Sequence, residues 1–308
     1  NPGSYVRNVV VNPLVPQPIV DAATDTDGDG LRDIFFSRRL ADVANRGNVA
    51  DRDTFRIVGG IEGEITDGWF LDAYVGYGQT KEAQVSSGQV NVLNFRSALE
   101  VIEDEDGNFI CRDATARAQG CVPANVYGAG TLSDEAVTYI AAPGLLATFA
   151  SQKYAGFNLS GEVFELPAGM VGIAFGGEYR EEFSRSEFDP LQQAGLNAGN
   201  AIPRTEGEFD VSEFYTEVNV PLLADMFMAD QLNLRGAVRV SDYSTVGNTT
   251  SWNVALDWAP IPELRFRAIR AESVRAPNVD ELFSPPTQDF PTGLTDPCLG
   301  VTNASTGT

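Results

Sequence analysis

The sequence predicts an all-β fold built from about eight long antiparallel strands. Apolar and polar residues alternate along several runs, and these runs come in pairs around short turns, which is the pattern of β-hairpins. The runs are about 12 residues long, whereas strands in soluble sheets average about 5 to 6 residues and a tilted strand needs about 9 to 11 to cross a bilayer. The strand length therefore favours a membrane protein.

Four hairpins carry this pattern. In the first, Phe55, Ile57 and Ile61 share one face while Arg56 and Glu62 lie on the other, because successive side chains point to opposite faces of a strand. The same alternation predicts three further hairpins. The paired runs are 55–65 with 69–77, 155–163 with 171–179, 214–222 with 232–240, and 252–258 with 264–274, with the fourth turn expected at Pro260–Pro262.

The connections between hairpins are longer than the turns inside them. Residues 79–152 form the longest connection, 181–210 an intermediate one, and only 244–248 is short. Short turns at one edge and long loops at the other are typical of outer-membrane barrels, but a secreted β-sandwich with long insertions shows the same alternation. Residues 1–52 lack the pattern and are predicted to be a loop region, and residues 53–308 hold the strands.

Composition excludes several functions. The chain has 43 acidic and 21 basic residues, a net charge of −22, and no histidine. Nucleic acid is excluded as a partner because a polyanion would be repelled. Without histidine there is no Ser-His or Cys-His triad and no histidine zinc site, and no other catalytic group stands out, so we expect no enzyme. No run approaches the ~20 apolar residues of a membrane-spanning helix.

An acidic motif lies in the loop region. Asp25, Asp27, Asp29 and Asp33 stand at relative positions 1, 3, 5 and 9, with Gly30 at position 6, which matches the first part of a calcium-binding loop. Position 12 of that loop is not the usual glutamate. The motif is therefore either a calcium site or a solvated acidic turn.

The cysteines predict one disulfide. Cys111 and Cys121 lie ten residues apart in the longest connection, a spacing that closes a small loop in an oxidising compartment. Cys298 is then left over, which suggests a partner outside this chain.

The stretch from Leu264 to Cys298 contains the most specific sequence motif of the chain. It reads SVRAPNVDELF and later DPC, and it resembles the mid-barrel signature of the TonB-dependent outer-membrane receptors. The segments GCVPANVYGAG, GGEYREE and VSDYSTVGNTTSWNVALDW resemble parts of the same barrel. The motif residues are Arg275, Ala276, Pro277, Asn278, Glu281, Leu282 and Phe283.

The resemblance implies a curved, partial transmembrane β-barrel in a Gram-negative outer membrane, cut from a barrel similar to one of about 22 strands. It implies uptake, coupled to the proton-motive force through TonB, of a scarce ligand such as a siderophore or a carbohydrate held at external loops. TonB would act through a plug domain expected before Asn1, with more strands after Thr308, so we expect a fragment. No cofactor is expected except possible calcium. The alternative is an exported, calcium-stabilised soluble β-protein such as an adhesin.

The motif also predicts local structure. Pro277 lacks a donor for a β ladder, so we expect the strand from Leu264 to end there, with Phe283 packing inward over the barrel mouth. Arg275 is expected to pair with a carboxylate such as Glu281 rather than to contact ligand. Two charges disturb the alternation, Arg270 and Glu272, which fall on the apolar side near the rim unless a bulge reverses the parity.

Overall fold

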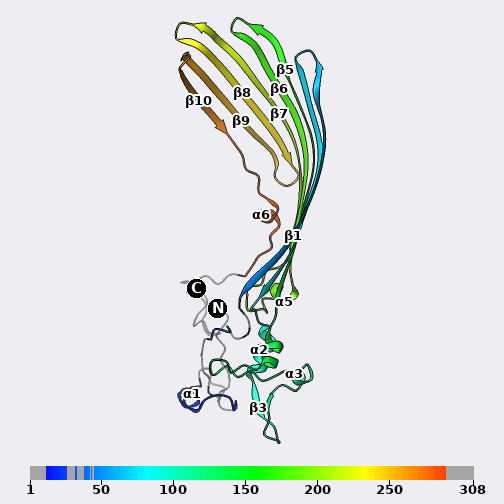
Figure 1. The fold of residues 1–308 in the computed structure, drawn as a ribbon, viewed down its shortest axis with the longest axis vertical. Coiled ribbons are helices and arrows are strands. Elements are labelled where there is room, and N and C mark those ends of the chain that lie inside the picture. The colour runs from blue at the N-terminus through cyan, green and yellow to red at the C-terminus, as the bar shows by residue number, and fades with distance from the viewer. Residues whose placement is uncertain (1–11, 26–31, 33–37, 42, 44, 289–308) are drawn as a thin grey trace, which may run out of the picture.

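One open antiparallel sheet dominates the chain. The computed structural model describes residues 12–25, 32, 38–41, 43 and 45–288. Within these residues eight strands form the curved sheet, in the order β1-β2-β5-β6-β7-β8-β9-β10 (Figure 1). The strands are β1 Gly47–Thr66, β2 Trp69–Ser87, β5 Gly144–Leu166, β6 Gly169–Phe188, β7 Thr205–Met226, β8 Ala229–Tyr243, β9 Gly247–Ile261 and β10 Leu264–Glu272.

The four predicted hairpins are confirmed. β1 pairs with β2, β5 with β6, β7 with β8, and β9 with β10, and their tight turns lie at the same end of the sheet (Figure 1). Phe55, Ile57 and Ile61 are 54%, 61% and 70% exposed, whereas a sandwich would bury them between two sheets. The sandwich interpretation is therefore wrong, and the curved partial barrel is correct.

The strands are longer than expected. β1 has 20 residues, β2 has 19 and β5 has 23, so the predicted loop 79–152 shrinks to residues 88–143, and β1 begins inside the predicted loop region 1–52. The ladder continues past the alternating segments because backbone pairing does not require an apolar face. The fourth turn is also displaced, since β9 runs through Ile261 and the turn is at residues 262–263.

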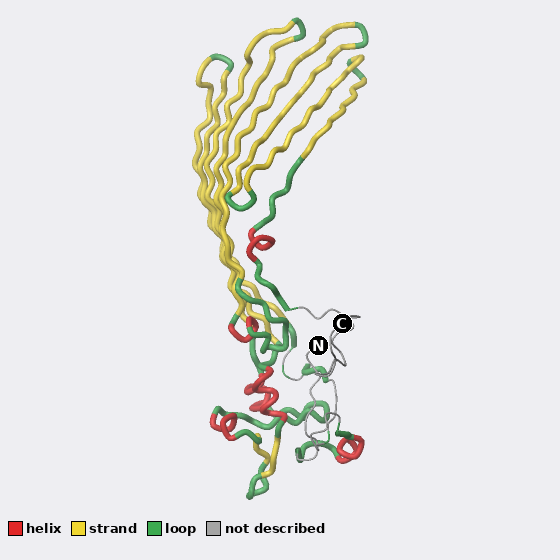
Figure 2. Tube along the Cα trace, turned by 180° about the vertical axis from the view of Figure 1, so that it is seen from behind, coloured by secondary structure: helices red, strands yellow, loops and turns green. Residues whose placement is uncertain are grey.

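A small folded unit lies at the end of the sheet opposite the hairpin turns (Figure 2). Much of it belongs to the connection between β2 and β5. Ala98, Ala136 and Ile140 are fully buried in its core. Its elements are α2 Val92–Leu99, β3 Val101–Glu103, β4 Phe109–Cys111, α3 Ala114–Ala118 and α4 Asp134–Ile140, with α5 Pro190–Gln193 after β6 and α1 Gln17–Ala22 near the start of the chain.

The parity of β10 is settled by its register. A register shift lies between Leu264 and Phe266, and from Phe266 to Glu272 the pairing with β9 is uninterrupted. No bulge between Phe266 and Glu272 moves Arg270 and Glu272 to the other face. Both stay on the apolar face, opposite Val254 and Trp252.

The two faces of β1 should respond differently to the same charge. Ile61→Arg places a charge on the apolar face, where a lipid environment penalises it by about 2–4 kcal/mol, and Glu62→Arg places one on the polar face. We expect the first variant to lower the yield of folded protein in the membrane fraction and the second to leave it unchanged. Heat-modifiable mobility on gels measures this, and equal yields would contradict the assignment of the faces.

Candidate functional site

The apolar face of the sheet, called the outer face, is bounded by aromatic and charged side chains. Near the hairpin turns, Trp258 stacks on Phe266 with ring centroids 5.6 Å apart, and its indole donates to the carbonyl oxygen of Met228 at 2.9 Å. Farther along the strands, Lys153 and Glu181 form an ion pair at 2.6 Å. An apolar band with an aromatic margin is the surface that a barrel presents to lipid.

The opposite, polar face is called the inner face, and its tyrosines lie flat on the wall. Tyr74 covers Gly156, where a Cβ would lie 2.6 Å from the phenol oxygen. Tyr215 covers Gly176 in the same way, with a Cβ only 2.7 Å from the ring. Glycine is required at these positions because any side chain would lift the ring away from the sheet. The two tyrosine rings therefore lie close to the backbone of the sheet.

Hydrogen bonds hold these rings across the strands. The Tyr74 hydroxyl on β2 donates to Glu178 on β6 at 2.7 Å, although β5 lies between them. The Tyr215 hydroxyl on β7 donates to Asn158 on β5, whose amide donates to Asp72 on β2 at 2.7 Å. The network spans four strands and fixes the inner face as a polar, hydrogen-bonded surface.

A buried carboxylate extends the network toward β8. Glu213 is 7% exposed, and it accepts a hydrogen bond from the hydroxyl of Ser241 at 2.5 Å. The Arg239 guanidinium lies 3.7 Å from Glu213 and 5.6 Å above the ring of Tyr215. Arg239 therefore leans toward β7, where its charge is matched by Glu213.

The segment after β10, residues 273–288, crosses back to the inner face and is called the mouth segment. It begins with a hydrogen bond from the Val274 amide to the Ser251 hydroxyl at 3.3 Å. At its end, the backbone amide of Ala201 donates to Gln288 at 3.0 Å. Its start is thus attached to β9, and its end is attached to the connection between β6 and β7.

The mouth segment contains α6 Val279–Phe283, which packs on β7. Val279 is buried against Phe209, Val211 and the half-buried Tyr243. Phe283 lies over Gly207, where any Cβ would collide with its ring. These contacts place α6 inside the curve of the sheet (Figure 1).

A salt bridge and a cap shape the start of α6. The Arg275 guanidinium donates to both oxygens of Glu281, at 2.9 Å and 2.7 Å. The Asn278 side chain accepts from the Glu281 amide, and the Glu281 carboxylate accepts from the Asn278 amide, both at 2.9 Å, which is a capping box. The hydrogen bonds from Arg275 and then from Asn278 lower the pKa of Glu281 to about 2. The folded value lies below the ordinary one, so this stabilisation is complete above about pH 4.5 and is lost as the pH falls toward 2.

The structure tests several predictions for this motif. Arg275 pairs with Glu281 and Phe283 packs inward, both as predicted. The expected strand end is wrong, because β10 stops at Glu272 and not at Pro277, where the chain has already turned inward to dock α6. The sequence interpretation also missed the capping role of Asn278, although an asparagine three residues before a glutamate is a recognisable signal.

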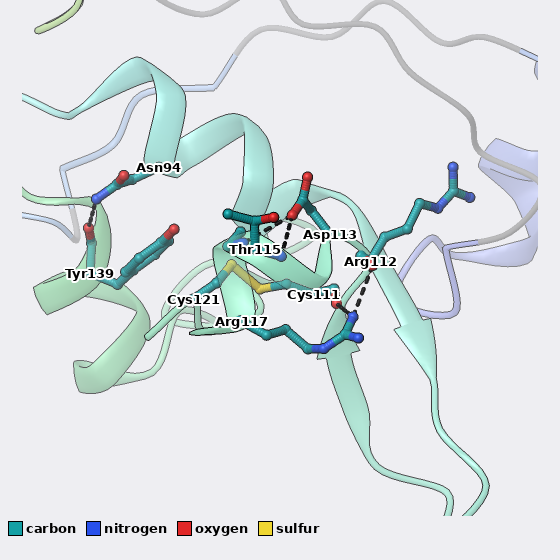
Figure 3. Close-up of a disulfide and its surroundings, with 9 residues drawn as sticks. Asn94, Cys111, Arg112, Asp113, Thr115, Arg117, Cys121 and Tyr139 are labelled. Carbon is teal, nitrogen blue, oxygen red and sulfur yellow. Dashed lines mark hydrogen bonds between the residues drawn. A yellow bond between two sulfur atoms is a disulfide. The ribbon is translucent and has the colours of Figure 1, made fainter. Parts of the chain in front are cut away.

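The predicted disulfide is present in the small folded unit. Cys111 on β4 is bonded to Cys121 just after α3, and Cys111 is fully buried (Figure 3). The Arg117 guanidinium donates to the carbonyl oxygens of Cys111 and Arg112 at 2.7 and 2.8 Å. Asp113 caps α3 through the amides of Thr115 and Ala116, and these hydrogen bonds lower its pKa. Cys298 lies outside the described residues.

The predicted calcium motif is only partly within the described residues. Asp25 is exposed, whereas Asp27, Asp29 and Asp33 lie outside them. Among the described residues, no group of three or more acidic or cysteine side chains is arranged to hold a metal ion. The calcium site stays a prediction.

Comparison with known proteins agrees with this geometry. The model of the TonB-dependent receptor-like β-barrel family matches residues 12–304, nearly the whole chain. The chain belongs to the TonB-dependent receptor family. No curated protein matches the sequence significantly.

Membership explains the arrangement of the two faces. TonB-dependent receptors form a family of outer-membrane receptors and transporters, in which the outer face contacts lipid and the inner face lines the passage. The inner wall and the α6 helix that packs on it therefore lie on the side of the sheet that faces away from lipid. In the described part of the chain, no helix has the length and apolar character to span a membrane.

The Arg275–Glu281 pair is expected to support folding. Arg275→Ala in the full-length receptor should reduce folded, surface-exposed protein more than it reduces ligand affinity per folded molecule. The reason is that the Arg275 guanidinium is paired with Glu281, the residue that caps the start of α6. Asp280→Ala, on the same helix, is the matched control. Surface labelling and binding assays on equal amounts of folded protein measure the two effects. Normal assembly with lost binding would instead make Arg275 a ligand contact.

Calcium binding is tested by calorimetry of the full-length receptor. The Asp27→Ala, Asp29→Ala double variant should lose a calcium-binding signal that the wild type shows, since both remove oxygen ligands from the motif. A Glu105→Ala, Asp106→Ala double variant, in the acidic turn between β3 and β4, should retain it. Identical traces for all three proteins would make the motif a solvated turn.

Proposed function

We propose that this chain forms part of the wall and mouth of a receptor that imports a scarce ligand across the outer membrane, driven by the proton-motive force through TonB. The single observation that carries the proposal is the match to the receptor barrel over residues 12–304. TonB would act through a plug domain, and the ligand would first meet the small folded unit and the mouth segment at the end opposite the short turns.

The inner wall supports passage of a polar ligand. Its tyrosines lie flat against glycines, so the wall projects little into the lumen, and their hydroxyls donate to Glu178 and Asn158. A chain with a net charge of −22 also favours neutral or cationic ligands over anionic ones. Siderophores and carbohydrates remain the candidate classes.

The alternative interpretation, a soluble calcium-stabilised adhesin, finds no support. Large apolar side chains such as Phe214 and Ile57 are 66% and 61% exposed on the outer face. A soluble protein rarely exposes so extensive an apolar surface.

Uptake measurements test the proposal. Cells carrying the receptor should deplete its ligand from the medium, and cells lacking either the receptor or TonB should not. A protonophore should stop uptake in the wild type while leaving binding at the cell surface intact, because only import requires energy. Uptake that persists without TonB would contradict the proposal, as would fractionation of the protein with soluble material.

A further inference from the structure

The turn between β7 and β8 carries three large apolar side chains in a row. Met226, Phe227 and Met228 are 58%, 97% and 51% exposed, and they are called the apolar tip. The other three hairpin turns of the sheet consist of small, polar or proline residues, namely Asp67 and Gly68, Pro167 and Ala168, and Pro262 and Glu263. Formation of a tight turn therefore does not explain the apolar tip.

The backbone of this turn would be better served by glycine. Met228 has a φ of 61°, in the left-handed region where a side chain crowds the backbone and glycine is favoured. In the turn between β1 and β2, Gly68 takes the left-handed conformation with a φ of 74°. Methionine is thus unfavourable for the turn itself, which points to a role for its side chain.

The apolar tip is joined to the lipid-facing outer face. The indole of Trp258, on the outer face of β9, donates to the carbonyl oxygen of Met228 at 2.9 Å. Trp258 also stacks on Phe266 at 5.6 Å and lies opposite Leu232 in the register of β8 with β9. The backbone of the turn is therefore attached to the aromatic margin of the band that contacts lipid.

Two carboxylates flank the apolar tip. Asp225 is exposed and Asp230 is half-buried, and within the described part of the chain neither forms an ion pair. An ionised carboxylate resists transfer into hydrocarbon, so Asp225 and Asp230 limit how deeply the tip can enter a bilayer. At the level of the headgroups these carboxylates are attracted by ammonium groups and repelled by phosphates.

We propose that the apolar tip is an interfacial anchor, which inserts Phe227 into the boundary between headgroups and acyl chains on the side of the hairpin turns. Apolar side chains at this boundary enter by about 5–10 Å. The lipid that fits is a zwitterionic aminophospholipid such as phosphatidylethanolamine, whose ammonium group faces Asp225 and Asp230. The anchor holds β7 and β8 at a fixed depth. This inference goes beyond import and requires only that the sheet lie in a membrane.

Fluorine relaxation in the full-length receptor measures the depth of Phe227. Trifluoromethyl-phenylalanine replaces Phe227, or Phe214 on the outer face, or Phe109 in the small folded unit, in vesicles of phosphatidylcholine and phosphatidylethanolamine. Oxygen, which concentrates in lipid, should relax positions 227 and 214 alike. A neutral nickel chelate should relax position 227 about threefold less than position 109, because a polar complex is excluded from apolar lipid. A nickel response equal to that of position 109, or shielding from both reagents by protein, would overturn the anchor.

Vesicles of a second composition test the headgroup. When phosphatidylglycerol replaces phosphatidylethanolamine, the nickel chelate should relax position 227 more strongly, because the anionic surface repels Asp225 and Asp230. The Asp225→Asn, Asp230→Asn double variant should abolish this difference between the two vesicles. Asp242→Asn, at the other end of β8, is the matched control and should retain it. Equal nickel responses of the wild type in both vesicles would overturn the choice of lipid.

The outcomes separate this proposal from the proposed function. Uptake that depends on TonB, together with a water-exposed Phe227, would remove the anchor and keep the transporter. A lipid-embedded Phe227, together with uptake that does not need TonB, would keep the anchor and remove the coupling.

Discussion

The structure depends on the need to satisfy every backbone hydrogen bond inside the sheet. In lipid no water replaces a missing partner, so each strand must pair along its whole membrane-spanning length. Seven consecutive antiparallel pairings meet this need in the described residues, from β1 with β2 to β9 with β10. Because pairing in register fixes the alternation of side chains, one face can contact lipid and the other can line a passage.

The inner face has to be polar without filling the lumen. A tyrosine paired with a glycine on the neighbouring strand supplies a polar hydroxyl group and adds little bulk. The ring packs flat over the glycine, which has no Cβ, as Tyr74 does over Gly156. The hydroxyl then reaches a carboxylate or an amide two strands away, which links strands that share no backbone bonds. The same pairing at Tyr215 draws Arg239 toward β7 and leaves the wall open beside it.

Much of this fold was predictable, because hairpins and faces follow from short-range alternation, and the disulfide from a spacing of ten residues. The pairing of β2 with β5 across residues 88–143 was not, since nothing local specifies a partner so distant. The extension of β2 to Ser87 was also missed, because residues 79–82 are all polar and interrupt the apolar alternation, which only Ala83 and Val85 resume. At the candidate site, Arg275 with Glu281 followed from charge and proximity, whereas the cover of Gly207 by Phe283 depends on the path of the whole mouth segment.

The charges on the outer face of β10 show how the mouth segment and the membrane surface constrain each other. Arg270 and Glu272 lie opposite Val254 and Trp252, on a face where charge is costly in mid-bilayer and cheap near its edge. β10 ends at Glu272, while β9 continues outward to Gly247, so both charges belong to the last residues of their strand. The Trp252 indole donates to the Glu272 carboxylate at 3.1 Å and thereby covers it with an amphipathic ring. The early end of β10 thus frees the chain to turn inward and dock α6, and it keeps these two charges close to the rim.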